Sequence, residues 1–360
     1  MDFALDDEQA LIVQTVRRFA ERDLRGWSAD ADRSGAPPDR LAGVASELGF
    51  FVDAVPADAD GALEGAYSHT TRALRSFELG RGCAGLAALL ETNVEPALAL
   101  GRWGSADAKQ ALFASLASGG HAALFHDSRG TLDIADAGDG LRVTGTLHPV
   151  PALALARHVL VVARKPSCVF LAATDAMRRT AITPSGWRAA GWAIAELDAL
   201  HVPAAFVVSR DTPAVGDTIL AWARVSLAAR AAGVASAAME YARRYANERV
   251  QFGQTIGSFE SLIRLRDDAE TSAIAARLFA LHAAWALDTK QPNAGDLASR
   301  ARVHAGDAVA RATIDAVQIF GGYGFVNDYP VEKLMRDARA FEALLGDERL
   351  GRVLAAKGMG

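Results

Sequence analysis

Two short stretches in the second half of the chain carry residue types that suit the binding of a phosphate group. One is the glycine turn Gly-Gly-Tyr-Gly at 321–324, and the other is the run Arg-Val-Gln-Phe-Gly at 249–253. Glycines allow positive φ angles and let backbone N–H groups approach an anion closely. An arginine can donate two hydrogen bonds to a phosphate while it stays charged. Taken alone, each stretch is more often an ordinary helix end with a glycine stop.

Metal and disulfide chemistry are not indicated by the sequence. The two cysteines, Cys83 and Cys168, have no paired spacing, and the eight histidines show no His-x-x-x-His pattern. Zinc sites need closely spaced ligands of this kind, and disulfide frameworks need several cysteines. We therefore expect no metal site, and we expect the histidines to be structural.

The composition indicates a globular protein and excludes several functional classes. With 360 residues and 51% hydrophobic residues, the chain can bury a sizeable core and divide into two or three domains. The net charge of −5 gives no electrostatic basis for binding nucleic acid or an anionic membrane. The N-terminal residues lack the pattern of a signal peptide, and no apolar run reaches the ~20 residues of a membrane span. The sequence predicts a soluble, cytoplasmic protein in a reducing compartment.

Changes in residue pattern divide the chain into three predicted domains, at 1–120, 121–213 and 214–360. In the first, apolar residues recur every three or four positions, which indicates helices. Two long Ala/Leu-rich helical stretches are expected at 63–80 and 83–102. In the second domain, short apolar or alternating runs are separated by Gly and Asp clusters, which predicts strands and a small β-barrel.

From residue 214 the chain is helical again. The stretch 216–249 predicts one helix of roughly 50 Å, at about 1.5 Å per residue. It is rich in alanine and contains Gly233, and small residues of this kind predict close approach to neighbouring helices. Long helices joined by short loops predict a four-helix bundle. The further helices are expected at 257–288, 295–320, 330–345 and 347–358.

In their order and spacing, the motifs of the chain resemble those of the acyl-CoA dehydrogenase family. In that family a Gln-x-x-Gly-Gly-x-Gly-Phe turn precedes Tyr-Pro-x-Glu-(Lys/Arg)-x-x-Arg-Asp, and both patterns occur here between 318 and 337. The first domain adds Glu-Leu-Gly-Phe at 47–50 and a Trp-Gly-Ser turn at 103–105. The resemblance implies an α+β, mainly α fold with an N-terminal helical domain, a middle β-barrel and a C-terminal four-helix bundle. Arg336 and Asp337 are expected to form a structural ion pair.

The resemblance also implies an FAD site at the interface between two subunits. In the family, the arginine run and the glycine turn of one subunit bind the FAD pyrophosphate of its neighbour. The residues at these positions are Arg249, Gln251, Phe252, Gln318, Gly321 and Gly322. The motifs that bind the flavin ring are eroded. A loop beginning at His126 replaces Thr-Glu-Pro-x-x-Gly-Ser-Asp, and Pro149 and Pro151 replace a tryptophan and a hydroxyl residue. Proline has neither a backbone N–H nor a side-chain donor to replace them.

The catalytic glutamate of the family is missing from both of its known positions. Removal of an acyl α-proton requires a carboxylate with a raised pKa in a dry site. Leu345 occupies the usual position, and Ala223, which precedes Arg224, occupies the alternative one. The nearby acids that could substitute are Glu342, Asp347 and Glu348. Each of these is otherwise expected to be a surface charge or a helix cap.

Three functions remain open at this point, and we favour the first. The chain is the non-catalytic subunit of a heterotetrameric acyl-CoA dehydrogenase and completes the FAD site of a glutamate-bearing partner, a variation known among steroid side-chain dehydrogenases. Alternatively, it is a self-sufficient FAD-dependent oxidoreductase with a substitute base, or a flavin-free homologue that keeps the fold for assembly or binding. The first two imply an acyl-CoA-type thioester, a homo- or hetero-tetramer and an electron-transfer acceptor, in fatty acid or steroid side-chain metabolism.

Overall fold

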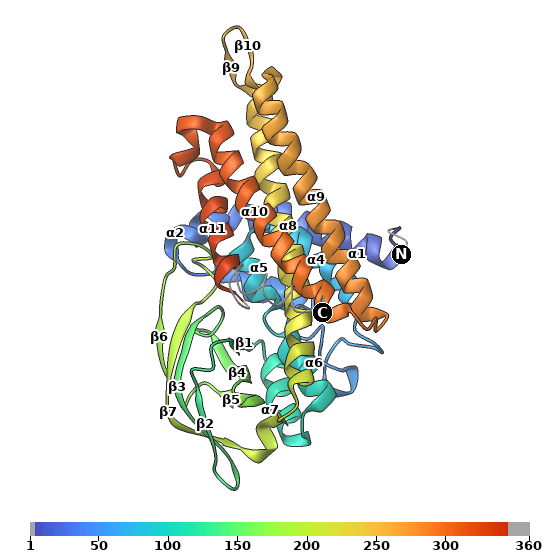
Figure 1. Ribbon diagram of the computed structural model, residues 1–360, viewed down its shortest axis with the longest axis vertical. Coiled ribbons are helices and arrows are strands. Elements are labelled where there is room, and N and C mark those ends of the chain that lie inside the picture. The colour runs from blue at the N-terminus through green and yellow to red at the C-terminus, as the bar shows by residue number, and fades with distance from the viewer. Residues whose placement is uncertain (1–3, 345–360) are drawn as a thin grey trace.

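The computed structural model describes residues 4–344 and confirms a mainly helical fold with a β-region in its middle (Figure 1). The chain begins with α1 (Asp7–Phe19), whose N-cap Asp6 exchanges side-chain and backbone hydrogen bonds with Gln9. A π-helical turn at Ala20–Leu24 then leads into α2 (Arg25–Ser34). The other helices before the β-region are α3 (Arg40–Glu47), α4 (His69–Gly82), α5 (Ala84–Glu91), α6 (Val94–Trp103) and α7 (Ala106–Ala117).

The helices in the predicted stretches 63–80 and 83–102 are shorter than expected. The first helix begins only after Ser68, whose side chain caps α4. The second stretch is interrupted at Asn93, between α5 and α6. The Asn93 amide donates to the carbonyl oxygens of Phe51 and Gly120 at 3.3 and 3.1 Å, and its oxygen accepts from Ala122 N at 2.8 Å. These hydrogen bonds join distant segments, so helical periodicity alone did not predict the interruption.

The β-region consists of two four-stranded sheets that share one core. One sheet has the order β1-β4-β5-β8, with β1 parallel to β4, and the other has the order β2-β3-β7-β6. Both sheets contribute to the core, for example through Phe170 and Leu197. The predicted small barrel is thus a pair of packed sheets. The strands are β1 (His121–Asp127), β2 (Asp133–Asp136), β3 (Gly140–Val150), β4 (Ala156–Arg164), β5 (Ser167–Ala173), β6 (Arg178–Ala181), β7 (Ala193–Pro203) and β8 (Val207–Arg210).

The C-terminal part is a helical bundle. Its helices in the described chain are α8 (Pro213–Glu248), α9 (Glu260–Asp288), α10 (Ala294–Phe320) and α11 (Pro330–Ala343). The hairpin of β9 (Val250–Gln251) and β10 (Gln254–Thr255) joins α8 to α9 at the tip of the bundle (Figure 1). Pro330 occupies the first turn of α11, as expected. The predicted helix at 347–358 lies outside the described residues.

The predicted close approach at Gly233 is confirmed where α4 crosses α8. A Cβ atom on Gly233 would lie 2.1 Å from the carbonyl oxygen of Phe77. Likewise, a Cβ atom on Gly80 would lie 2.4 Å from the carbonyl oxygen of Arg230. Because both contacts are with backbone atoms, a larger residue at either position must push the helices apart. The two glycines therefore fix the position of α8, and with it Arg230, relative to α4.

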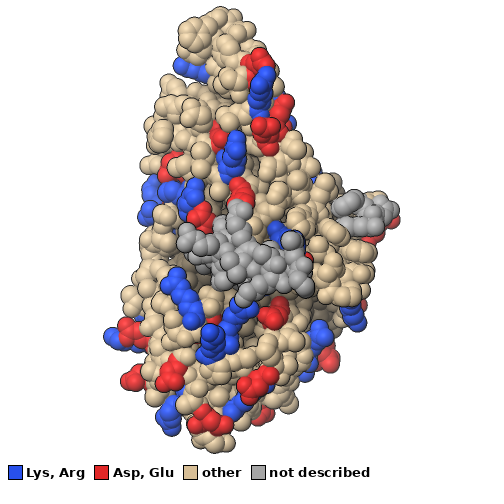
Figure 2. All heavy atoms as spheres, viewed as in Figure 1, with Lys and Arg blue, Asp and Glu red and all other residues tan. Residues whose placement is uncertain are grey.

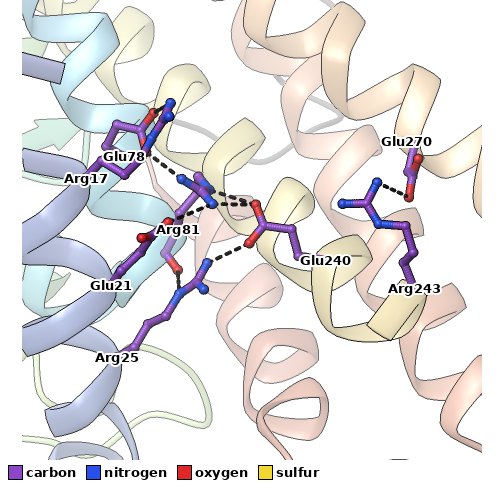
Figure 3. A network of polar contacts seen from close by, with 8 residues as sticks. All are labelled: Arg17, Glu21, Arg25, Glu78, Arg81, Glu240, Arg243 and Glu270. Atoms are coloured by element: carbon purple, nitrogen blue, oxygen red, sulfur yellow. Dashed lines mark hydrogen bonds and ion pairs between the residues drawn. The ribbon is translucent and has the colours of Figure 1, made fainter. Parts of the chain in front are cut away.

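A network of ion pairs holds the first helices against the bundle (Figure 3). Arg81 on α4 contacts Glu78 at 2.7 Å and Glu240 on α8 at 2.6 Å. Glu78 also pairs with Arg17 on α1, at 2.7 Å. Glu240 also pairs with Arg25 on α2, at 2.8 Å. On the molecular face in Figure 2, acidic and basic side chains are interspersed, in keeping with the small net charge.

Candidate functional site

The first candidate site is a groove of about 450 Å³ at the tip of the bundle. It lies between the end of α8, the β9–β10 hairpin and the glycine turn that follows α10. Four of the six residues predicted to bind FAD line it, namely Arg249, Gln251, Gly321 and Gly322. Aromatic and aliphatic side chains make up the remaining wall. These are Tyr245, Ile256, Ile319, Phe320, Tyr323 and Val326.

The glycine turn presents open backbone to this groove. After α10 ends at Phe320, Gly321 adopts a φ of 58° and a ψ of −133°, a conformation that favours glycine. No atom lies within 4 Å of the place where a Cβ would stand on Gly321 or Gly322. A ligand phosphate can therefore approach the main chain of this turn without meeting a side chain.

Arg249 supplies an available positive charge beside the turn. Its guanidinium stands over the Tyr323 ring, 5.7 Å from the ring centre. It forms no ion pair with any carboxylate in residues 4–344. In the same groove the rings of Tyr245 and Phe320 stack with their centres 4.2 Å apart. An exposed guanidinium without an acidic partner is suited to receive an anionic ligand.

The other two predicted FAD contacts lie beside the groove rather than in its wall. Gln318 is exposed on the last turn of α10, and its carbonyl oxygen accepts a hydrogen bond from Gly321 N. Phe252 stands at the end of the β9–β10 hairpin, 93% exposed. Its φ of 52° is unusual for a bulky residue, and Gly253 follows with a φ of 81°. Positive φ angles at both residues are those of a tight two-residue turn, which is the connection between β9 and β10.

The second candidate site is an interior cavity that opens to the surface, with a volume of about 90 Å³, between the α4–α6 helices, α8 and the β-region. Ala223, the alternative position of the family base, lines this cavity. Leu344 lines it too, and its neighbour Leu345, the usual base position, lies outside the described residues. Of the two predicted base positions, the described one, Ala223, therefore lies at this cavity. Its wall also holds four buried charged residues, Arg72, Glu91, Glu95 and Arg230.

Glu91 is the most strongly held acid of this cavity. It accepts hydrogen bonds from Arg230 Nη2 at 2.7 Å, Ser76 Oγ at 2.7 Å and Arg75 Nε at 3.3 Å. Burial alone would raise the pKa of Glu91, but the charges of Arg230, Arg75 and Arg72 outweigh burial and lower this pKa to about 2. A carboxylate that binds protons so weakly is a poor general base at neutral pH.

The remaining acids around the cavity are also paired with arginines. Glu95 accepts a hydrogen bond from Arg72 at 2.7 Å, and both side chains are nearly inaccessible. Asp53 pairs with Arg75 at 2.6 Å. Our reading of the sequence missed this cluster, because Glu91 and Arg230 are 139 positions apart. The available signal was the pair of glutamates, Glu91 and Glu95, inside an otherwise apolar helical stretch.

Of the acids considered as substitute bases, only Glu342 lies in the described chain. It pairs with Arg339 at 2.5 Å, its side chain is 37% exposed, and it is not among the residues that line the cavity. Asp347 and Glu348 lie outside the described residues. Glu342 is therefore absent from the wall of the cavity, and the two described carboxylates that line it, Glu91 and Glu95, are both paired with arginines.

Arg224, which is buried, and His126, which is half-buried, have side-chain nitrogens that are shielded from solvent and form no hydrogen bond. Arg224, which follows Ala223, is 7% exposed, and its Nη2 has no partner. Burial lowers the pKa of Arg224 to about 10, assisted by the positive charge of Arg164. Neither ring nitrogen of His126 has a partner. Burial and the charge of Arg224 lower the pKa of His126 to about 3, so this ring is neutral at pH 7.

The expected ion pair between Arg336 and Asp337 is wrong. Arg336 instead contacts Asp32 at 2.7 Å and Glu332 at 2.5 Å. Asp337 binds Lys333 at 2.6 Å and also accepts a hydrogen bond from the backbone N–H of residue 187 at 2.7 Å. Consecutive residues on a helix do not face each other, so each finds partners elsewhere. Both residues fix α11 to its neighbours.

Within residues 4–344, no group of three or more His, Cys, Asp or Glu side chains is arranged to hold a metal ion. Cys83 and Cys168 are buried free thiols. None of the helices in the described chain combines the length and the apolar character needed to cross a membrane.

Comparisons with known proteins agree with this architecture. Models of the acyl-CoA dehydrogenase N-terminal and C-terminal domains match residues 6–120 and 214–360. The chain is 29% identical to the probable acyl-CoA dehydrogenase YngJ of Bacillus subtilis, over 99% of both proteins. Its fold is similar to butyryl-CoA dehydrogenase from Megasphaera elsdenii, with a TM-score of 0.89 and 23% identity over 100% of both chains. It is also similar to PigA in its FAD complex, with a TM-score of 0.89 and 20% identity over 100% of this chain and 99% of PigA. The chain belongs to the acyl-CoA dehydrogenase family.

Proposed function

We propose that this chain is the non-catalytic subunit of a heterotetrameric, FAD-dependent acyl-CoA dehydrogenase. In this proposal its bundle tip completes the FAD site of a partner chain that carries the catalytic glutamate. The observation that carries the proposal is the distance between the two candidate sites along α8. Ala223 lines the interior cavity and Arg249 lines the tip groove. Twenty-six residues of helix at about 1.5 Å each separate them by roughly 39 Å.

One extended FAD is shorter than this separation, so it cannot bridge the groove and the cavity of the same chain. The tip groove is therefore suited to the pyrophosphate of an FAD whose flavin ring is held by a neighbouring chain. Arg249 donates hydrogen bonds to the pyrophosphate, and the open turn at Gly321 and Gly322 leaves room for the pyrophosphate beside the main chain. FAD, when bound, supplies the hydride acceptor of the reaction.

The interior of this chain is poorly suited to catalysis on its own. Ala223 has no side-chain proton acceptor, and Leu345 has none at the usual position. Glu91 is ionised and held by three donors, and Glu95 is paired with Arg72. These observations support a partner that removes the α-proton.

The residues at the family's ring-binding positions also favour a neighbouring chain as the one that binds the flavin ring. Pro151 lines the interior cavity at the position where the family has a hydroxyl residue. Proline can neither donate a hydrogen bond from its backbone nor offer a side-chain hydroxyl. The residues of this chain therefore fit the pyrophosphate end of FAD better than its ring.

The remaining details of the proposal follow from this role. The complex acts on an acyl-CoA-type thioester and transfers electrons to a separate acceptor protein. We propose domain boundaries at 1–120, 121–213 and 214–360. The third domain then carries the tip groove and the contacts between subunits.

The test is the visible absorption spectrum of the full chain alone and after co-expression with a family member that retains the Tyr-Glu-Gly-Thr motif. We expect little flavin on the lone chain and about two FAD per mixed tetramer, since half of the interfaces are complete. Arg249→Met should remove most of this flavin. The control Arg244→Met changes another exposed arginine, paired with Glu248 on α8, and should retain it. Full flavin occupancy on the lone chain would contradict the proposal.

A further inference from the structure

A third pocket, with a volume of about 440 Å³, lies between α2, the end of α4 and the beginning of α11, and it opens to the surface. It shares no lining residue with the tip groove or the interior cavity. The acids in its described wall are Asp32, Asp328 and Glu332. The cations outnumber them, and these are Arg25, Arg33, Arg81, Arg188, Lys333 and Arg336. We call this site the α2–α11 pocket.

Several of these cations are paired with acids that lie outside the wall of the pocket. Arg25 and Arg81 both bind Glu240, at 2.8 and 2.6 Å, and both point toward it in Figure 3. Lys333 binds Asp337 at 2.6 Å. Neither Glu240 nor Asp337 lines the pocket. The pocket is therefore lined by the cations of these pairs rather than by their acids, which makes its electrostatic potential positive.

Arg188 is a cation of this wall that has no acidic partner. Its guanidinium forms no ion pair or hydrogen bond with any group in residues 4–344. The side chain is half-buried, and its Nε is shielded from solvent. A guanidinium remains charged, and its planar fork can donate two hydrogen bonds to one oxyanion. An anionic ligand in the pocket would therefore balance a charge that the described chain leaves unbalanced.

The backbone on either side of Arg188 is fixed without a ligand. Trp187, which precedes it, is 1% exposed, and its N–H donates a hydrogen bond to Asp337 on α11 at 2.7 Å. Ala189, which follows it, is also buried. Because these neighbours are already ordered, little conformational entropy of the main chain is lost when Arg188 binds a ligand.

We propose that the α2–α11 pocket binds the phosphate group of a small anionic ligand. Arg188 donates hydrogen bonds to the phosphate, and Arg33 in the same wall adds positive charge. The side chains of Ser28 and Asn327 also line the pocket and supply neutral donors. A phosphate suits this wall better than a carboxylate does, because it carries a larger negative charge and has more acceptor oxygens.

Titration calorimetry with inorganic pyrophosphate tests this proposal on the full chain carrying Arg249→Met. That change removes the guanidinium of the tip groove, where a pyrophosphate is also expected to bind. We expect saturable binding to remain at one site per chain. Acetate, which has one charge and two oxygens, should bind at least about tenfold more weakly than pyrophosphate. No binding of pyrophosphate, or equal affinity for acetate, would overturn the proposal.

A second change to the same chain asks whether Arg188 is the residue that binds. Arg188→Met should weaken pyrophosphate binding about tenfold or more, as expected when hydrogen bonds between charged groups are lost. The matched control, Arg178→Met, changes an exposed arginine of β6 that pairs with Glu196 and does not line the pocket. This control should retain the affinity. If Arg188→Met folds and binds pyrophosphate as tightly as the control, the proposal is wrong.

Arg33→Met decides the question if Arg188→Met does not fold. The Arg33 side chain is 77% exposed and pairs with the equally exposed Asp30, so its loss should leave the fold intact. Pyrophosphate affinity should fall about threefold, as for one charge several ångströms away in water. Unchanged affinity would contradict the proposal. The flavin spectrum of the mixed complex depends on the tip groove, so either proposal can fail while the other stands.

Discussion

The interior cavity and the bundle tip use the same residue type, arginine, in opposite ways. Arg230 in the cavity is 6% exposed and bound to Glu91 at 2.7 Å. Arg249 at the tip is exposed, and its contact is the ring of Tyr323. Arg230 lies within α8 and Arg249 is the residue that caps its C-terminal end, so both are positioned by the same helix. An arginine paired within the chain stabilises the fold, whereas an arginine without an acidic partner remains available for a phosphate.

Glycines show the same division between the two regions. Gly233 and Gly80 let two helices approach so closely that a Cβ would collide with backbone oxygens. Gly321 and Gly322 border open space. The interior glycines therefore serve packing, and those at the tip serve access to the main chain. Whether a glycine serves helix packing or access to the main chain therefore depends on whether backbone atoms or open space face it.

The largest expected effect comes from changing the two arginines to methionine. Arg230→Met leaves the buried Glu91 without a principal partner, and the loss of a buried ion-pair partner typically costs about 3–5 kcal/mol of unfolding free energy. Arg249→Met, at an exposed site without an ion pair, should change the stability of the lone chain by about 0.5 kcal/mol or less. Urea unfolding of both variants measures the difference. Similar losses in the two variants would show that the contrast between paired and available arginines is false.

A smaller effect is expected for the two kinds of glycine. Gly233→Ala places a Cβ 2.1 Å from the Phe77 carbonyl oxygen, and overpacking of this type costs about 1–3 kcal/mol or more. Gly322→Ala meets no atom within 4 Å and serves as the control. Its stability should stay within about 0.5 kcal/mol of the unmodified chain. Thermal and urea unfolding measure the stability of both variants. If Gly233→Ala leaves the free energy of unfolding unchanged, α4 and α8 can move apart with little loss of stability.

The fold and the tip were predictable from the sequence because their signals are local. The spacing of apolar residues indicated the long helices, and the Gly-Gly-Tyr-Gly string ended α10 where expected. The resemblance named Arg249 and the turn, which are two short strings that the bundle brings together in one groove. Four of the six predicted contacts line that groove. Gln318 and Phe252 stand beside it.

The cavity was not predictable in the same way, since its members meet only through tertiary structure. Glu91 and Arg230 come from helices that are distant in sequence. The interruption at Asn93 depends on hydrogen bonds to segments on either side of it. Arg336 and Asp337 are adjacent in sequence, yet each contacts other residues because the helix turns them apart. Adjacency in sequence was therefore a poor guide to the partners of these charged side chains.

The smallest predicted effect concerns polar groups in the interior that have no partner. Glu91 is paired and stays charged, whereas the His126 ring lacks hydrogen-bond partners. Burial, together with the charges of Arg224 and Arg164, lowers the pKa of His126 to about 3. The nearby charge of Asp127 opposes this effect only in part. As the pH falls below 6.5, the ordinary pKa of histidine, His126 takes up a proton in the unfolded chain but stays unprotonated in the folded chain. The free energy of unfolding must therefore decrease as the pH falls from 6.5 towards 3.

His126→Gln should reduce this dependence by at most about 1.4 kcal/mol per pH unit, the limit for a single titrating group. Urea unfolding of the variant and the unmodified chain at several pH values between about 5 and 7 measures the slope. His148→Gln changes an exposed histidine and is the control. Burial also lowers the pKa values of His69, to about 3, and of the half-buried His121, to about 4, so part of the slope should survive in the variant. An unchanged slope would mean that His126 has access to water or to a partner. The contrast between the paired, charged Glu91 and the unpartnered, neutral His126 would then fail.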